Sequence, residues 1–376
     1  MPHPLSPRLD HCPPGLPRAA YVDAGWHARE MRAVFGAEWV CAGRLADLAP
    51  GTMRRVSLGD APVILCRDAE GALSAFHNTC RHRGAELCRE AVEPMGKLIR
   101  CPYHAWAFAA ADGRLVSTAH AQPTADFDRA VHGLFPVSVR VWAGFVFLNA
   151  AAQPGPLHAD MPLETLDNWP MAGLVTGHRS ERLLECNWKG FWENYSECLH
   201  CPGIHPELCD MVPVYGRGIM GANEAPDWTP DMPVQPTLKP GAQSWTLSGA
   251  PCGPVFSGLT QGERDAGYTF VTLWPSVFVV AHVDYVRAVR LEPVSATQTR
   301  LIAEWYFPPE TLAQPGFDAA KVAGFAQIVL DQDGDAAEMN QRGLASPAFQ
   351  RATLMPEEYE IARFHGWIRA HLEGSP

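Results

Sequence analysis

The sequence predicts an α+β protein of two domains, a small antiparallel β domain followed by a larger domain in which a β-sheet wraps around a long C-terminal helix. The chain of 376 residues is long enough for two separate cores. In its first half, short β-type runs alternate with turn dipeptides such as Asp60-Ala61 and Asp112-Gly113. Its last third contains strand-like runs at residues 268–274, 277–283, 285–293 and 299–307, and helix-like stretches at residues 318–344 and 356–371.

Changes in this pattern divide the chain. Residues 21–40 have apolar positions at helical spacing, which predicts a helix before the first β-type run. Pro and Gly accumulate in residues 150–160, where the periodicity stops, and this indicates a linker. Beyond it, residues 183–200 are expected to be helical. The predicted parts are an N-terminal helical segment, residues 1–38, a first domain, residues 39–155, and a second domain, residues 156–376.

Two pairs of cysteine and histidine in the first domain can hold a metal centre. Cys80 and His82 form the first pair, and Cys101 and His104 form the second, with residues 83–100 between them. Two thiolates on one iron and two imidazoles on the other are the ligands of a Rieske [2Fe–2S] cluster, whose nitrogen ligands raise its reduction potential. A zinc site is the alternative, since Zn²⁺ binds the same side chains tetrahedrally. Both pairs are expected at the tips of β-hairpins.

The residues around these pairs carry a family resemblance. Residues 80–84 (CRHRG) and 101–106 (CPYHAW) resemble the Rieske domains of the Rieske non-haem iron oxygenases. The resemblance implies that the first domain has the Rieske fold and that the second is a catalytic domain of the helix-grip (START-like) kind. It also implies that the second domain holds a mononuclear Fe(II) ion.

The second domain contains a pair of histidines suited to such an ion. His200 and His205 are five residues apart, and on an unbroken helix they would point about 140° away from each other. Pro202 and Gly203 are therefore expected to break the helix and turn His205 back. Glu197 lies three residues before His200 and is expected on the same helical face.

Two histidines need one carboxylate to complete the facial triad that binds Fe(II) and leaves positions open for O₂ and substrate. Asp331, Asp333 and Asp335, in the helix-like stretch near the C-terminus, compete for this role. The segment from Glu338 to Leu344 resembles the family's pattern, and counting back from it implies Asp333.

The acidic residue three positions before His200 helps to predict the class of substrate. In the family, it bridges a cluster histidine of one subunit to an iron histidine of the next in a head-to-tail homotrimer, and here it is Glu197. Most aromatic-ring-hydroxylating members have aspartate there. Glutamate, together with residues 193–208 (ENYSECLHCPGIHPEL), resembles the group that oxidises quaternary ammonium compounds, namely choline, glycine betaine, carnitine and stachydrine oxygenases.

The resemblance implies a monooxygenase component that receives electrons from a separate NAD(P)H-dependent reductase of flavin or ferredoxin type. With O₂ it would hydroxylate or oxidatively demethylate a small betaine-like substrate. An aromatic-ring-hydroxylating dioxygenase or O-demethylase of the same superfamily is the alternative, and a Rieske electron-transfer protein is a more distant one. Because a quaternary ammonium group has no N–H to donate, its site is expected to use aromatic faces. The candidates are Trp245, Phe256, Tyr268, Phe270, Trp274, Phe278, Tyr285 and Trp305.

Composition and charge exclude other classes of protein. The chain has 30 basic and 41 acidic residues and a formal net charge of -11, which argues against binding to nucleic acid. Apolar runs such as residues 139–152 are too short and too interrupted to span a bilayer. The first residues do not resemble a secretion signal, so we expect a cytoplasmic protein with reduced cysteines. The chain also lacks a dinucleotide-binding glycine fingerprint, which again points to a reductase partner.

Overall fold

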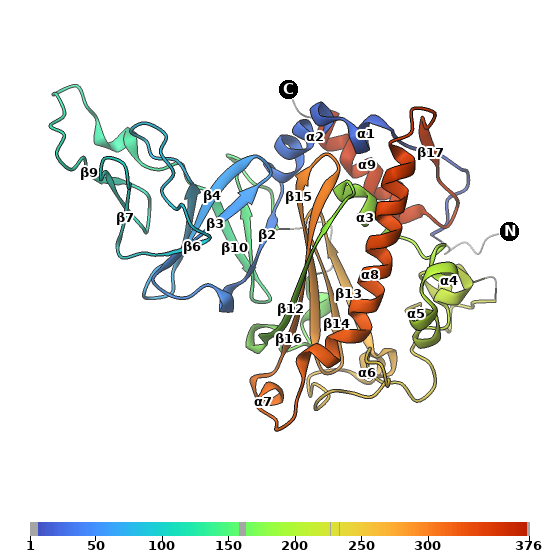
Figure 1. Cartoon of the computed structure of the whole chain (residues 1–376). Helices are drawn as coiled ribbons and strands as arrows, with labels where there is room; N and C mark the ends of the chain where they lie inside the picture. The colour runs from blue at the N-terminus through green and yellow to red at the C-terminus, as the bar shows by residue number, and fades with distance from the viewer. Residues whose placement is uncertain (1–6, 158–162, 226, 233, 374–376) are drawn as a thin grey trace. The chain divides into compact units, whose positions relative to one another are not determined.

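The computed structural model describes residues 7–157, 163–225, 227–232 and 234–373, and it divides into two compact units (Figure 1). Ala28–Asp160 form one, called here the small unit, and Met1–His27 together with Met161–Pro376 form the other, called the large unit. The domain bounds predicted from the sequence, at residues 38/39 and 155/156, remain predictions. Residues 1–6, 158–162, 226, 233 and 374–376, which belong to predicted segments, lie outside the described residues.

The expected N-terminal helix consists of two short helices and one further turn. Helices α1 (Ala19–Val22) and α2 (Ala24–Glu30) are separated by Asp23, and a π-helical turn, Met31–Phe35, follows. Asp23 has an extended backbone, and its carboxylate accepts a hydrogen bond from the Trp26 N–H at 2.7 Å. This is the geometry of an N-cap, so one residue ends α1 and starts α2.

The small unit is built from antiparallel strands, as the alternating pattern predicts. Its four-stranded sheet has the order β5-β4-β3-β6, and two three-stranded sheets have the orders β7-β8-β9 and β10-β11-β2. The strands are β2 (Val40–Arg44), β3 (Thr52–Leu58), β4 (Ala61–Arg67), β5 (Leu73–His77), β6 (Val92–Pro94), β7 (Leu98–Arg100), β8 (Ala107–Ala109), β9 (Leu115–Ser117), β10 (Ser138–Trp142) and β11 (Phe145–Asn149).

The two Cys/His pairs lie in two different kinds of loop. Cys101 and His104 lie at the tip of the β7–β8 hairpin, as expected. Cys80 and His82 follow β5 in the connection to β6, and these strands form opposite edges of their sheet. The expectation of two hairpin tips was therefore wrong for the first pair, because its loop crosses from one sheet edge to the other.

The large unit contains a five-stranded antiparallel sheet of order β12-β16-β15-β14-β13. The four strand-like runs of the last third form β13 (Tyr268–Leu273), β14 (Val277–His282), β15 (Val286–Ser295) and β16 (Gln298–Phe307). The sequence pattern does not predict the fifth strand, β12 (Val175–Leu184), which lies at a sheet edge. Its side chains are half-buried or exposed almost throughout, so the apolar alternation that identifies a strand is missing.

Helix α8 (Ala319–Leu344) runs along this sheet (Figure 1). It begins at the predicted place, because the Asp318 carboxylate accepts hydrogen bonds from the N–H groups of Ala320 and Lys321. A buried stripe repeats along it every three or four residues, and Asp333 stands within this otherwise mainly apolar stripe. Gly334 lets the helix approach β12, since a Cβ there would lie 2.8 Å from Arg182 Nη1.

The other helices of the large unit are short, except for one at the C-terminus. They are α3 (Trp188–Tyr195), α4 (Cys201–Ile204), α5 (Pro206–Met211), α6 (Gln261–Ala266), α7 (Pro309–Leu312) and α9 (Tyr359–Glu373), and a small sheet pairs β1 (Pro14–Pro17) with β17 (Arg351–Thr353). The helical stretch expected at residues 183–200 is thus limited to α3. Among the described residues, no helix has both the length and the apolar character that crossing a bilayer requires.

Candidate active site and metal centres

The two loops of the small unit that carry the Cys/His pairs have the same pattern of backbone hydrogen bonds. The N–H of Cys80 donates to the carbonyl of Ala85, and the N–H of Cys101 donates to the carbonyl of Trp106, both at 2.8 Å. In each loop the fifth residue has positive φ, 76° at Gly84 and 57° at Ala105, and its N–H returns to the carbonyl of the cysteine. The loops therefore present their cysteine and histidine side chains in matching turns.

The side chains of these loops are arranged with sulfur inside and nitrogen outside. Cys80 and Cys101 are buried in the core of the small unit, while His82 is exposed and His104 half-buried. The two imidazole rings lie 4.7 Å apart between centroids. Trp106 stacks on His82 with an interplanar angle of 11°, which holds that ring in place. The structure thus brings the four predicted cluster ligands to one end of the unit.

The donor set fits an iron–sulfur cluster. Burial, and to a smaller extent the neighbouring Cys101, raises the pKa of the Cys80 thiol to about 11. Two adjacent buried cysteines ionise together only where a cation compensates their charge, which bound iron would do. His82 and His104 would then be the nitrogen ligands.

In the large unit, His200, His205 and Asp333 meet at one point. Their ligand atoms all lie within 4.8 Å of one another. His205 Nε2 is 2.9 Å from Asp333 Oδ1, His200 Nε2 is 3.5 Å from the same oxygen, and the two nitrogens are 3.1 Å apart. Two neutral imidazole nitrogens and a carboxylate oxygen are all acceptors, so a cation at this point would satisfy all three.

The far side of each imidazole is oriented by a hydrogen bond. His200 Nδ1 donates to Glu197 Oε1 at 2.5 Å, and His205 Nδ1 donates to Gln332 Oε1 at 2.7 Å. Gln332 is held in turn by Glu207, which accepts from its Nε2 at 3.0 Å. These bonds place a proton on each Nδ1 and orient both rings with Nε2 facing Asp333, which is the support expected around metal ligands.

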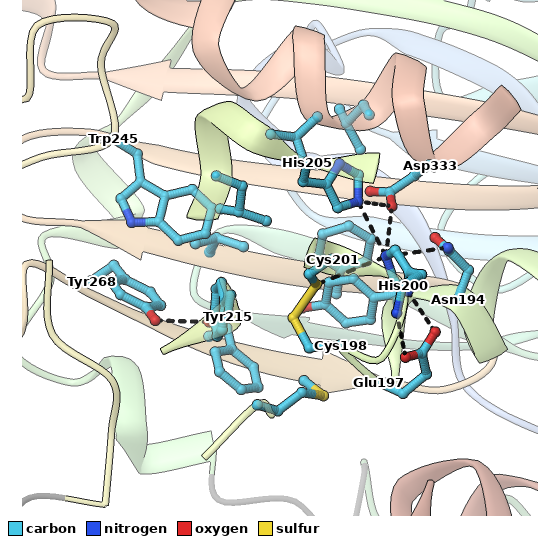
Figure 2. A pocket seen from close by; sticks show the side chains of 18 of the residues that line it. Asn194, Glu197, Cys198, His200, Cys201, His205, Tyr215, Trp245, Tyr268 and Asp333 are labelled. Atoms are coloured by element: carbon cyan, nitrogen blue, oxygen red, sulfur yellow. Dashed lines mark hydrogen bonds and ion pairs between the residues drawn. A yellow bond between two sulfur atoms is a disulfide. The ribbon is translucent and has the colours of Figure 1, made fainter. Parts of the chain in front are cut away.

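Glu197 contacts His200 through a turn and not along a helical face. Helix α3 ends at Tyr195, so the expectation that Glu197 and His200 share a helical face was wrong. The second Glu197 oxygen instead accepts hydrogen bonds from the N–H groups of Leu199 and His200. One carboxylate thus fixes both the backbone and the ring of His200 (Figure 2).

The backbone break that redirects His205 also differs from the expected one. Pro202 and Gly203 lie inside the short helix α4, where Pro202 occupies a first-turn position. The chain breaks at His205 itself, with φ -116° and ψ 68°, between α4 and α5. Because a residue before proline is disfavoured in the helical region, Pro206 is the cause of this break.

Asp333 lies on a different side of α8 from Asp331 and Asp335. Asp335 pairs with Arg182 of β12 at 2.7 Å, and Asp331 accepts from Gln327 and lies 4.0 Å from the same arginine. Asp333 alone of the three contacts the histidines. In the sequence only the family resemblance separated Asp333 from the other two, and the structure adds that Asp333 alone of the three lies in the buried stripe of the helix.

Cys198 and Cys201, which flank His200, are joined by a disulfide. The expectation that all cysteines are reduced was wrong for this pair, and the described residues contain no second disulfide. The disulfide closes the short loop that carries Leu199 and His200.

A cavity of about 90 Å³ lies beside His200, His205 and Asp333 (Figure 2). Six aromatic side chains line it, namely Tyr195, Tyr215, Trp245, Tyr268, Phe270 and Phe278. Four of these belong to the aromatic residues singled out in the sequence, whereas Tyr195 and Tyr215 do not. Phe256, Trp274, Tyr285 and Trp305 do not line this cavity. The remaining polar wall includes Asn194, Glu197 and Arg287.

The protonation of His200 should make iron loading depend on pH. Burial acts to lower the pKa of this imidazole, but hydrogen bonds with Asp333 and Glu197 outweigh burial and raise the pKa to about 9. The imidazolium is therefore favoured in the metal-free protein below about pH 9, and its proton must leave before Nε2 can bind a metal. We expect the affinity for Fe(II) to rise roughly tenfold per pH unit between about pH 7 and 8.5, as one released proton requires.

Anaerobic titration of metal-free protein with Fe(II) at several pH values measures this dependence. Release of one proton per iron, followed with a pH indicator in weak buffer, provides an independent readout. An affinity that does not change with pH would contradict the expectation.

Comparisons with known proteins cover both units. Residues 166–374 match the family described as ring hydroxylating alpha subunit (catalytic domain), and residues 38–128 match the Rieske [2Fe-2S] domain. The glycine betaine monooxygenase oxygenase subunit of Chromohalobacter salexigens is 31% identical, over 94% of this chain and 84% of the relative. The carnitine monooxygenase oxygenase subunit of Escherichia coli K12 is 28% identical, over 94% of this chain and 92% of the relative.

Solved structures confirm the fold. The quaternary ammonium Rieske monooxygenase CntA in complex with its substrate L-carnitine has a TM-score of 0.70 and 21% identity, over 96% of both chains. Naphthalene 1,2-dioxygenase from Rhodococcus sp. bound to indole has a TM-score of 0.67 and 16% identity, over 96% of this chain and 95% of that chain. The predicted order, a Rieske domain followed by a catalytic α+β domain, is therefore confirmed.

Proposed function

The chain belongs to the ring-hydroxylating oxygenase α subunits, which combine a Rieske [2Fe–2S] domain with a catalytic domain for mononuclear iron, and we propose that its substrate is a small quaternary ammonium compound. The reaction would be hydroxylation or oxidative demethylation with O₂. The match of residues 38–128 rules out the zinc alternative, and the match of residues 166–374 rules out a protein that only transfers electrons.

The aromatic cavity carries this proposal. A trialkylammonium group cannot donate an N–H hydrogen bond, so it is recognised by the electron-rich faces of aromatic rings. The cavity presents six such rings beside His200, His205 and Asp333. The betaine- and carnitine-oxidising relatives agree with this chemistry.

The residues that hold the cofactors are part of the proposal. Cys80, His82, Cys101 and His104 would hold the cluster, and His200, His205 and Asp333 would hold the mononuclear iron. When bound, the two centres supply electrons and the activation of O₂. The protein's own contribution is to orient the imidazoles through Glu197 and Gln332, to exclude bulk water with the aromatic wall, and to hold an N-methyl group beside the metal ligands.

The partners and the assembly follow from the family. We propose that a separate NAD(P)H-dependent reductase of flavin or ferredoxin type supplies electrons, and that three copies form a head-to-tail trimer. In it, Glu197 of one subunit would face the cluster histidines of the next, and its bond to His200 supplies one half of that bridge. A cytoplasmic location is part of this proposal, because that compartment holds the NAD(P)H that the reductase consumes. Gel filtration with light scattering measures the trimer, and cell fractionation measures the location.

Reconstituted turnover tests the proposed function. Purified protein with a general flavin–ferredoxin reductase, NADH and O₂ should release formaldehyde, or form a hydroxylated product seen by mass spectrometry, from glycine betaine, carnitine, choline or stachydrine. Aromatic carboxylic acids serve as the competing panel. Hydroxylation of the aromatic acids without oxidation of any ammonium compound would instead support an aromatic-ring hydroxylase or O-demethylase of the same superfamily.

A further inference from the structure

One cationic side chain in the cavity has no role in the metal centre. Arg287 lies on β15 and is only 4% exposed, and its side chain lines the cavity. In the sheet register it stands opposite Val280 of β14, which in turn stands opposite Phe270 of β13. Directly opposed residues of antiparallel strands share one face, and all three line the cavity. The register therefore directs the guanidinium into the same space as the aromatic wall.

The guanidinium lacks the partners that a buried charge needs. Its Nε and Nη1 are buried and have no hydrogen-bond partner within the part of the chain that the structure describes. Arg290, three residues along the same strand and also buried, pairs with Glu292 and Glu304. A buried arginine is normally paired or hydrogen-bonded, since the desolvation of an isolated charge is very costly.

The nearby carboxylate is already engaged. Asp333 is close enough to Arg287 to interact with it electrostatically, but its Oδ1 contacts both metal-site histidines. The other groups that act on Arg287 are the hydroxyls of Tyr195 and Tyr285, and the indole of Trp245 stands 5.9 Å from its carbon Cζ. Burial lowers the pKa of Arg287 in spite of these groups, in keeping with a cation that still lacks an anion.

We propose that Arg287 binds the carboxylate of the substrate, so that the preferred substrates are zwitterionic betaines and not ammonium alcohols. This inference rests on the proposed function and names the substrate class more narrowly. The planar guanidinium offers paired N–H donors that match a carboxylate, and a carboxylate here would complete the buried ion pair. The guanidinium would bind the carboxylate and the aromatic rings of the cavity would bind the ammonium group, so these two features distinguish the ends of the substrate.

Paired substrates test this role. In Arg287→Met, the KM for glycine betaine should rise on the order of 100-fold, the usual scale for loss of one partner of a buried charge pair. The kcat/KM for choline, which has a hydroxymethyl group in place of the carboxylate, should change by less than about threefold, because choline makes no such pair. Arg287→Lys keeps the charge but loses the planar fork, so it should recover part of the lost affinity for glycine betaine.

Thermal unfolding separates binding from a structural role. Removal of an unpaired buried charge should leave the Tm of Arg287→Met unchanged or higher. Arg290→Met is the matched control, because it removes a paired arginine from the same strand: its Tm should fall, while its preference between glycine betaine and choline stays that of the unaltered protein. Equal losses with both substrates, or a large drop in the Tm of Arg287→Met, would overturn the proposed anchor.

Calorimetry distinguishes failure of this inference from failure of the proposed function. The unaltered protein and Arg287→Met are titrated with glycine betaine and choline and with benzoate and benzyl alcohol. If no ammonium compound is turned over but benzoate binds in a manner that requires Arg287, the proposed function fails and the carboxylate anchor stands. If carboxylates bind both proteins equally well, or bind neither, the anchor is wrong whatever the turnover.

Discussion

Replacement of Asp333 by Asn should lower turnover at least about 1000-fold, because it removes the carboxylate proposed to bind the mononuclear iron. The carboxylate oxygen Oδ1 lies 2.9 Å from His205 Nε2 and 3.5 Å from His200 Nε2, so one atom faces both histidines. Asparagine keeps the shape of the side chain but loses its charge. The iron content should fall by one atom per chain, while the absorption and electron paramagnetic resonance signals of the Rieske cluster stay unchanged.

The neighbouring aspartates of α8 are the controls for this change. Asp335 pairs with Arg182 on the side of the helix that faces β12, and Asp331 lies near the same arginine. Asp335→Asn and Asp331→Asn should therefore keep the full iron content and most of the activity, with at most a small loss of stability from an exposed ion pair. Retention of iron and activity in Asp333→Asn, or loss of iron in Asp335→Asn, would show that the ligand was assigned to the wrong residue.

Replacement of Glu197 by Gln should slow turnover on the order of 100-fold while both metals remain bound, the scale seen when a group that orients a metal ligand is removed. One Glu197 oxygen accepts from His200 Nδ1, and the other accepts from the N–H groups of Leu199 and His200. Glutamine has one acceptor oxygen, so it cannot satisfy the ring and the backbone together. In the proposed trimer it also removes the charged acceptor for the neighbouring subunit's cluster histidine.

Rapid-mixing kinetics measures the effect of Glu197→Gln on electron transfer. Reduced protein is mixed with O₂ and substrate, and reoxidation of the Rieske absorption band reports electron transfer to the second site. Glu207→Gln is a matched control, because Glu207 reaches His205 only through Gln332 and should have a smaller effect. An unchanged rate of cluster reoxidation in Glu197→Gln would remove Glu197 from the electron path, and loss of the mononuclear iron would make it a support of the ligand only.

Local sequence determined much of this architecture. The strand-like apolar runs at residues 268–307 form strands β13–β16, because short apolar runs bounded by turns favour buried strands. Asp318 marks the start of α8 with a side-chain cap that involves only the next few residues. Each Cys/His pair of the small unit likewise lies within one short loop, whose backbone hydrogen bonds join residues only four or five positions apart.

Other elements depend on distant contacts that local patterns do not contain. Strand β12 lacks apolar alternation and becomes a strand because β16 supplies its hydrogen bonds. The turn that connects Glu197 to His200 replaces an expected helix, since α3 ends at Tyr195. Pro206, and not Pro202 or Gly203, redirects His205. Each of these three segments could adopt several local conformations, and packing against the rest of the large unit selects one of them.

The type of chemistry in this protein could be predicted from local sequence, because the spacing of two Cys/His pairs and of two histidines limits which metals can bind. These residues are Cys80, His82, Cys101, His104, His200 and His205. Which residues share the cavity could be seen only in the folded chain. The fold placed Asp333, and neither of its neighbours, against the histidines, and it brought Arg287 of β15 into the same space. The physical reason is that ligand type is a property of side chains, whereas the shape and charge of a cavity arise from elements far apart in the chain.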